Sequence, residues 1–235
     1  MLPKDLSLTH GFAVLFLFAC WLLYSRVLAY FGRGSLNAQL AVVRRYWISG
    51  ATRRATKPFD GILLGHIINS TAFFGSATLI VLAAVLTALA RVKQIHETIS
   101  QLHFVAETSL ELFALAMGFL AFVLAMCFFS FTYALRKLVY VLALLGALPD
   151  KSENCPTHDD LVDATTMVLS EAIMTFNFGI RGYYYAVAAL CLLVSPVLSI
   201  AVTAFVTGIL FHRQLMTPTA RAIQKYVEAA KSLER

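Results

Sequence analysis

Residues 108–135 read TSLELFALAMGFLAFVLAMCFFSFTYAL and contain one charged side chain, Glu111. An α-helix rises about 1.5 Å per residue, so about 20 apolar residues cross the hydrocarbon core of a bilayer. This stretch therefore predicts a membrane-spanning helix. Two adjacent cations, Arg136 and Lys137, follow it and predict that the helix leaves the membrane there. The apolar residues that continue to Leu148 predict an interfacial or bundle-packed tail, with a re-entrant segment as the alternative.

Three other stretches have the same character and predict further spans at residues 11–31, 61–90 and 183–211. Overall, 59% of the 235 residues are apolar and 14% are charged, which is more apolar surface than one soluble core could bury. The predicted fold is an all-α polytopic membrane protein, a four-transmembrane-helix bundle forming a single membrane domain over residues 1–235. Ser195 and Pro196 predict a bend in the fourth span.

Short charged segments separate the spans. Residues 35–55, 92–106 and 157–177 predict interfacial amphipathic helices, and residues 217–235 predict a basic C-terminal helix. The first of these helices has an apolar face, and four arginines occupy its other positions. We expect these arginines to contact anionic lipid headgroups: Arg44, Arg45, Arg53 and Arg54. The net charge of +6 is not concentrated in a domain-sized soluble region, so nucleic acid is not an expected partner.

Polar side chains inside the predicted spans are the strongest functional signal. Unpaired polar groups are costly in hydrocarbon, so these side chains should face protein or water. Two interpretations remain open, hydrogen bonding between helices and the lining of an aqueous pathway. At the entry to the fourth span, Arg181 could reach the headgroups or close a buried polar network with Asn177 and Glu171. The candidate residues are His66, Asn69, Ser70, Thr71, Ser130, Thr132, Asn177 and Arg181.

Small residues predict close helix contacts. Gly61 and Gly65 form a G-x-x-x-G pattern at the start of the second span, and Gly118 lies in a small-residue stripe of the third. Their spacing does not tell whether the contact lies within one chain or between copies. We expect a homo-oligomer.

Neither a metal site nor a catalytic site is predicted. His96, His103 and Glu107 share one helical face, but without a fourth ligand nearby a solvated amphipathic helix is the favoured interpretation. The sequence contains no zinc-protease, nucleophile-elbow, phosphate-loop or dinucleotide motif. We therefore expect no cofactor and no enzymatic activity.

Three motifs together resemble a known family. They are INSTAFFGS at residues 68–76, FFSFT at residues 128–132 with Arg136, and FNFGIRGYY at residues 176–184. Across nearly its whole length the chain is similar to the domain of unknown function 599 (DUF599) family. After Arg136 it has Lys-Leu-Val where the family pattern has Gln-Tyr-Asn, so no role is carried over to that turn.

The resemblance implies a four-span membrane protein without a settled activity. It draws attention to three residues, Asn69, Asn177 and Arg181, and implies no catalytic or ligand residue.

Two functional hypotheses follow. The first is a homo-oligomeric channel or transporter-like bundle for a small ion or solute, with a slight preference for anions because of Arg181 and the basic loops. The second is a non-catalytic scaffold or accessory subunit of a larger membrane complex, with a membrane-protein partner. We expect a multi-pass protein of a bacterial inner membrane, and the distribution of cations leans toward termini outside the cytoplasm.

Overall fold

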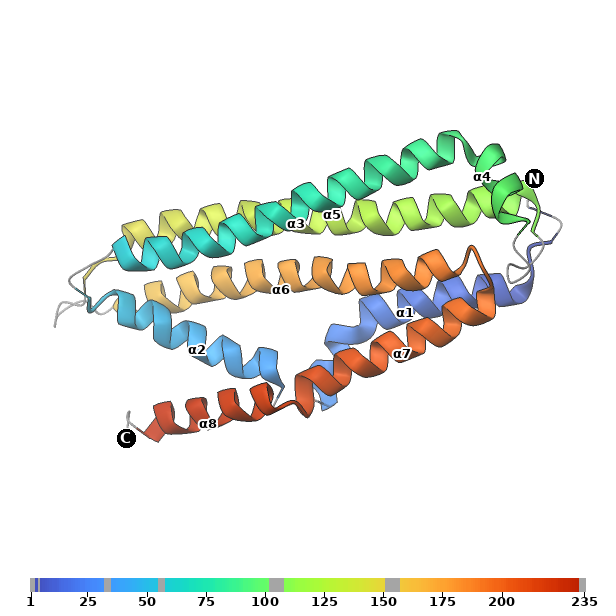
Figure 1. Ribbon diagram of the computed structural model, residues 1–235. Coiled ribbons are helices and arrows are strands. Elements are labelled where there is room, and N and C mark those ends of the chain that lie inside the picture. Colours follow the sequence, from blue (N-terminus) through green and yellow to red (C-terminus); the bar gives the residue numbers. More distant parts are fainter. Residues whose placement is uncertain are drawn as a thin grey trace. The chain divides into compact units, whose positions relative to one another are not determined.

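The structure is a computed structural model that describes residues 3, 5–31, 35–54, 58–101, 108–150 and 157–232. Within these residues every regular element is a helix (Figure 1). The predicted all-α fold is confirmed. The helices are α1 (Leu8–Phe31), α2 (Leu36–Ala51), α3 (Pro58–Ala90), α4 (Val92–Ile99), α5 (Leu110–Ala147), α6 (His158–Cys191), α7 (Pro196–Leu215) and α8 (Pro218–Ser232).

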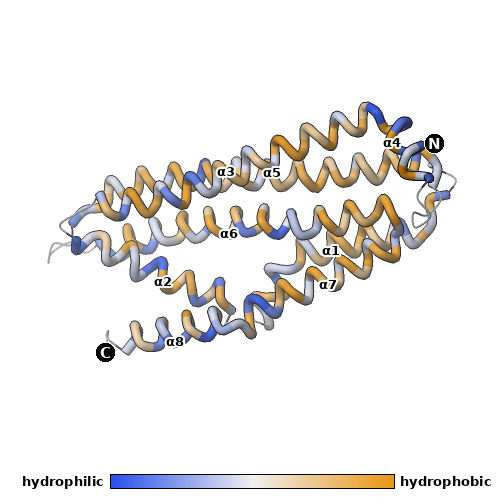
Figure 2. The backbone as a smooth tube through the Cα atoms, viewed as in Figure 1, coloured by the Kyte–Doolittle hydropathy of each residue, from blue (hydrophilic) through white to orange (hydrophobic). Residues whose placement is uncertain are grey.

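Four helical segments of the described chain are long and apolar enough to cross a membrane. They are Leu8–Tyr30, Pro58–Ala90, Leu110–Ala147 and Pro196–Ser232. Figure 2 shows the apolar residues along α1, α5 and α7, and hydrophilic residues within α2, α4 and α8. The chain is thus an integral, multi-pass membrane protein, as its composition predicts.

The predicted start of the fourth span is wrong. Residues 183–191 belong to α6, which runs without a break from the predicted interfacial helix at 157–177. Gly179 and Gly182, which fall between the two predicted helices, both lie within this helix. The break falls instead before Pro196, which starts α7 at the helical position where its missing N–H is not needed.

The third predicted span is longer than expected. Helix α5 continues through Arg136 and Lys137 to Ala147, so the apolar tail extends the same helix and is not re-entrant. The other amphipathic helices begin close to their predicted positions. α4 ends at Ile99. Residues 102–106 of the predicted 92–106 helix lie outside the described residues, as do residues 233–235 of the predicted C-terminal helix.

The chain forms two compact units. The first unit contains Met1–Val27, Gly75–Phe129 and Phe178–Leu210, and the second contains Leu28–Phe74, Ser130–Asn177 and Phe211–Arg235. Helices α3, α5 and α6 each contribute one segment to each unit. The single membrane domain expected from composition stays a prediction.

Trp21 is the largest buried side chain of the first unit. It is 1% exposed, and its ring stacks on Phe178 with the centroids 4.9 Å apart. Gly182 allows this approach, because a Cβ atom there would lie 2.7 Å from Trp21 Cζ2 and against Cys127 Sγ. The first unit therefore joins α1, α5 and α6 around a position where only hydrogen fits.

The second unit has an aliphatic core. It joins α2, α3, α5 and α6 through buried side chains, and α2 also lies beside α8. Phe74, Phe131 and Phe176 add an aromatic cluster with centroid separations of 5.6 to 5.8 Å. The core residues are Ile48, Leu64, Leu138, Val141, Leu148, Val162, Leu169 and Ala172.

Replacing Gly182 by alanine should destabilise the protein. The added methyl group has no room beside Trp21 and Cys127, and overpacking of this kind costs about 1–3 kcal/mol. Gly208→Ala on α7 is the matched control in the same unit. No atom lies within 4 Å of its added Cβ, and alanine stabilises a helix by up to about 1 kcal/mol relative to glycine. Thermal unfolding in detergent measures both, and equal melting temperatures for the two variants would contradict the packing described above.

Asp5, which precedes α1, caps the start of α5. Asp5 Oδ2 accepts a 2.6 Å hydrogen bond from the Ser109 N–H, and Asp5 Oδ1 accepts one of 2.6 Å from Ser109 Oγ. Ser109 Oγ in turn accepts from the Leu112 N–H at 3.2 Å. The hydrogen bonds from the Ser109 side chain and backbone lower the pKa of the Asp5 carboxyl below its ordinary 3.8.

This cap predicts a pH dependence. Because the folded-state pKa of Asp5 is lowered, its stabilisation is present above the ordinary value and is lost as the pH falls through the folded-state pKa. Asp5→Ala should therefore lower the melting temperature at neutral pH. In strongly acidic buffer the variant and the wild type should melt together. A difference that persists after Asp5 is protonated would mean that its charge is not what stabilises the cap.

Candidate functional site

Helix α3 presents polar side chains away from its own bundle. His66, Asn69 and Ser70 are exposed, whereas Leu64 and Thr71 are buried on the opposite side of the helix. The structure gives the three exposed side chains no hydrogen-bond partner among the residues it describes. We call His66, Asn69 and Ser70 the outward polar face. Figure 2 shows hydrophilic colour within α3, which is otherwise largely apolar.

Thr71 differs from its neighbours. It is 1% exposed, and its Oγ1 donates a 2.8 Å hydrogen bond to the Ile67 carbonyl one turn earlier. The hydroxyl is thus satisfied by its own helix. Of the four polar residues predicted together on this span, the structure separates Thr71 from the other three.

The predicted packing glycines face open space. A Cβ atom added to Gly61, Gly65 or Gly118 would meet no other atom within 4 Å. These glycines therefore do not bring helices of the described chain together. Gly182, which the small-residue pattern did not single out, packs closely against Trp21 and Cys127.

Arg181 is enclosed in the first unit. Arg181 is 8% exposed, and its Nη2 donates a 2.9 Å hydrogen bond to Ser25 Oγ. Its guanidinium lies 5.0 Å from the centre of the Tyr24 ring and 5.9 Å from the centre of the Phe178 ring. The Nε–H is buried without a hydrogen-bond partner in the described chain. Cation–π contacts with these two rings thus stabilise the guanidinium charge, as a paired carboxylate would otherwise do.

The remaining predicted polar residues do not gather at one point. Ser130 is buried and Thr132 is exposed on α5, while Asn177 is half-buried on α6. Glu171, which could have joined Asn177 and Arg181 in a network, instead pairs with Lys137. That network is not formed.

Lys137 and Glu171 form an ion pair that the sequence analysis did not identify. Lys137 Nζ lies 3.3 Å from Glu171 Oε2, donates to Thr175 Oγ1 at 2.9 Å, and sits 4.7 Å from the centre of the Tyr133 ring. The partners lie 34 residues apart, so no local spacing could reveal them. Two adjacent cations between apolar stretches of one long helix are the signal that could have prompted a search for an acidic partner.

Three of the four arginines expected at lipid headgroups have protein partners. Arg44 Nε donates to Ser170 Oγ at 3.0 Å, Arg45 pairs with Asp163 at 2.6 Å, and Arg54 pairs with Asp60. Burial lowers the pKa of the Arg44 guanidinium, although arginine stays protonated in proteins. Arg53 is exposed. Headgroup binding stays a prediction, and Arg53 is now the arginine best placed for it.

No cluster of metal-ligating side chains occurs among the described residues. His96 Nε2 lies 2.8 Å from the Thr108 carbonyl oxygen, and its ring packs on Phe113. His103 and Glu107, the other two residues of the predicted face, lie outside the described residues.

Comparison with known proteins identifies the family. The sequence profile described as "protein of unknown function, DUF599" matches residues 12–219. The chain belongs to the DUF599 family. The match covers every helix of the structure at least in part, so the resemblance seen in the sequence is confirmed. Neither the curated proteins nor the solved structures compared with the chain contain a match.

The Arg181 site in this DUF599 protein predicts a double-mutant cycle. Ser25→Ala should cost about 1–3 kcal/mol, because it leaves a buried guanidinium N–H without a partner. Arg181→Met should cost little or should stabilise, since it removes a buried, incompletely paired charge and keeps an apolar side chain in place. In the Arg181→Met background, Ser25→Ala should then cost less than about 0.5 kcal/mol.

Chemical unfolding in detergent micelles measures all four states of the cycle. Additive losses, with Ser25→Ala equally costly in both backgrounds, would show that Ser25 does not act through Arg181.

Proposed function

We propose that this DUF599 protein is a homo-oligomeric membrane bundle in which the outward polar face of α3 lines a pathway for a small ion or solute. The observation that carries the proposal is the exposure of His66, Asn69 and Ser70 on a helix long and apolar enough to cross a membrane. Hydrocarbon offers these groups no hydrogen bonds, so protein or water must supply them.

A glycine beside this face supports a second copy as its neighbour. Gly65 lies one turn before Asn69, and no atom lies within 4 Å of a Cβ added to it. Small residues let helix backbones approach closely in membranes, where packing drives association. Copies that meet along Gly65 would bring the Asn69 side chains near one another and separate them from lipid.

The chemistry of the face suits weak, transient contacts. An imidazole, an amide and a hydroxyl can each donate and accept hydrogen bonds, so they can replace part of the hydration shell of a passing solute. We do not place Arg181 in the pathway, because Tyr24, Phe178 and Ser25 enclose it. The slight preference for anions therefore loses its main support.

The scaffold hypothesis uses the same surface. A different membrane protein that covers the outward polar face would satisfy it equally well. The composition of the native assembly separates the two hypotheses, because the pathway requires several copies of this chain and the scaffold requires a foreign subunit.

The pathway predicts a flux that depends on Asn69. In proteoliposomes the wild type should raise potassium or chloride flux above that of empty vesicles, and Asn69→Leu should reduce it about tenfold or more, because one lost polar contact of about 1.4 kcal/mol changes a rate by that factor. Thr71→Val is the control. It alters a hydroxyl two positions away that bonds to its own helix, and should leave flux unchanged.

Native mass spectrometry after mild extraction should show several copies of the chain. A monomer, or wild-type flux no higher than that of empty vesicles for ions and small neutral solutes, would rule out the pathway. A stable complex with another membrane protein would favour the scaffold.

A further inference from the structure

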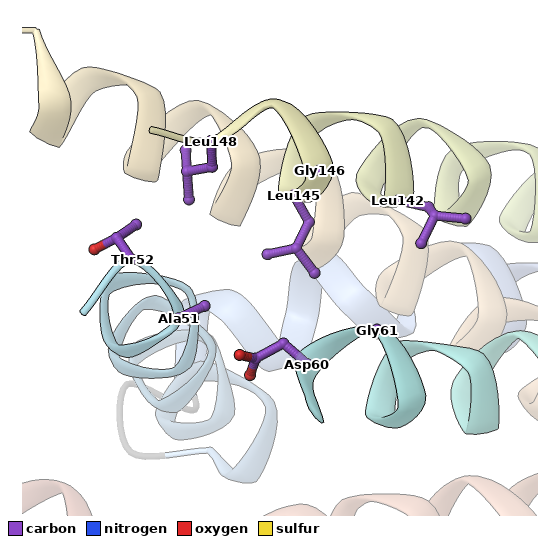
Figure 3. Close-up of a pocket in the computed structure, with 8 residues that line it drawn as sticks. All are labelled: Ala51, Thr52, Asp60, Gly61, Leu142, Leu145, Gly146 and Leu148. Carbon is purple, nitrogen blue, oxygen red and sulfur yellow. The ribbon is translucent and has the colours of Figure 1, made fainter. Parts of the chain in front are cut away.

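A cavity of about 120 Å³ lies in the second unit, away from the outward polar face (Figure 3). The end of α2, the start of α3 and the end of α5 form its wall, which is almost entirely apolar. Figure 3 shows the Asp60 carboxylate among these residues. The lining residues are Ala51, Thr52, Asp60, Gly61, Leu142, Leu145, Gly146 and Leu148.

Asp60 is the charged group of this wall, and one of its oxygens lacks a partner. The residue is 1% exposed. Its Oδ1 accepts a 2.7 Å hydrogen bond from Trp47 Nε1 and pairs with Arg54 Nη1. Its Oδ2 is buried without a hydrogen-bond partner in the described chain. A buried, unsatisfied carboxylate oxygen is costly, so a missing donor is the natural explanation.

The structural role of Asp60 does not account for this oxygen. A carboxylate in the first turn of α3 is favoured by the helix dipole, and the contacts with Trp47 and Arg54 tie α2 to α3. The contacts with Trp47 and Arg54 use Oδ1, and the interaction with the helix dipole requires only the carboxylate charge. Nothing in those contacts requires Oδ2 to be buried at the edge of a space lined by leucines.

We propose that this cavity binds a neutral, hydroxyl-bearing amphiphile. Its O–H donates to Asp60 Oδ2, and its apolar part lies against Leu142, Leu145 and Leu148. The ligand is neutral because Arg54 already balances the carboxylate charge. Water alone fits poorly, since an ordered water needs two to four polar partners and this wall offers few.

The size and place of the cavity agree with this ligand. A cavity of about 150 Å³ holds a benzene molecule, so about 120 Å³ holds the hydroxyl end of a short alcohol or of a glyceride. Asp60 directly precedes the uncharged residues 61–90, which places the site where α3 enters its apolar stretch. Amphiphiles orient a polar head and an apolar tail at such a boundary. The proposal does not depend on the pathway, which uses a different face of α3.

Photolabelling with an aliphatic alcohol that carries a diazirine group tests the proposal. The full-length wild type is placed in phosphatidylcholine vesicles, whose lipid has no hydroxyl group to compete. Mass spectrometry should find the label on peptides that contain Thr52 or residues 142–148. An excess of 1-hexanol should remove the label, whereas hexyl methyl ether, which lacks a donor, should not.

Gly146→Leu is the decisive variant because it leaves Asp60 intact. Gly146 lines the cavity and has no atom within 4 Å of an added Cβ, so a larger side chain can start there without a clash and take up space in the cavity. Labelling should fall about tenfold, because the occupied volume excludes the probe. Gly118→Leu is the matched control on the same helix, with equal open space outside the cavity, and should label like the wild type.

Two results would overturn the proposal, namely equal labelling of Gly146→Leu and the wild type, or equal competition by the ether and the alcohol. A monoacylglycerol that competes at lower concentration than 1-hexanol would identify a membrane lipid as the ligand. The reverse order would identify a small free alcohol. Both of these outcomes support the hydroxyl site, and neither depends on whether the protein conducts ions.

Discussion

Hydrocarbon supplies no hydrogen bonds, and this one constraint decides where polar side chains can lie in the protein. On α7, Thr203 and Thr207 bond to carbonyls of their own helix, and Ser199 donates to the Ala188 carbonyl of α6 at 2.8 Å. Tyr24 of α1 donates to the Leu210 carbonyl of α7 at 2.9 Å. In contrast, the three side chains of the outward polar face of α3 have no hydrogen-bond partner among the described residues, and this suggests a function.

The same constraint bears on Lys137, a cation within helix α5. Lys137 is held by Glu171, Thr175 and the Tyr133 ring, so its charge is balanced within the second unit. The α5 helix of 38 residues is about 57 Å long, well beyond a hydrocarbon core of about 30 Å. A helix of this length extends beyond the membrane, and the ion pair marks a stretch where charge is tolerated.

The sequence was sufficient to predict features that depend on local composition. Four apolar stretches predicted four spans, because hydropathy depends on neighbouring residues alone. Prediction from the sequence failed for features that are determined by tertiary contacts. The predicted fourth span begins at residue 183, yet α6 runs without a break through Gly179 and Gly182, and Gly182 packs closely against Trp21 of α1. The partners of Arg45, Arg54 and Lys137 could not be read from spacing, since side-chain pairs between helices depend on packing that no local pattern encodes. The unpaired Oδ2 atom of Asp60 could not be predicted from the sequence for the same reason.

The close fit at Gly182 also bears on how the family can diverge. Where Trp21 and Cys127 leave room only for hydrogen, a larger residue at position 182 becomes tolerable if the indole or the thiol shrinks at the same time. The three positions lie on three different helices, far apart in the chain, yet they should evolve as a unit. Homologues that lose the tryptophan are thus the ones free to lose the glycine, and such compensating changes would record this helix contact in the evolutionary history of the sequence.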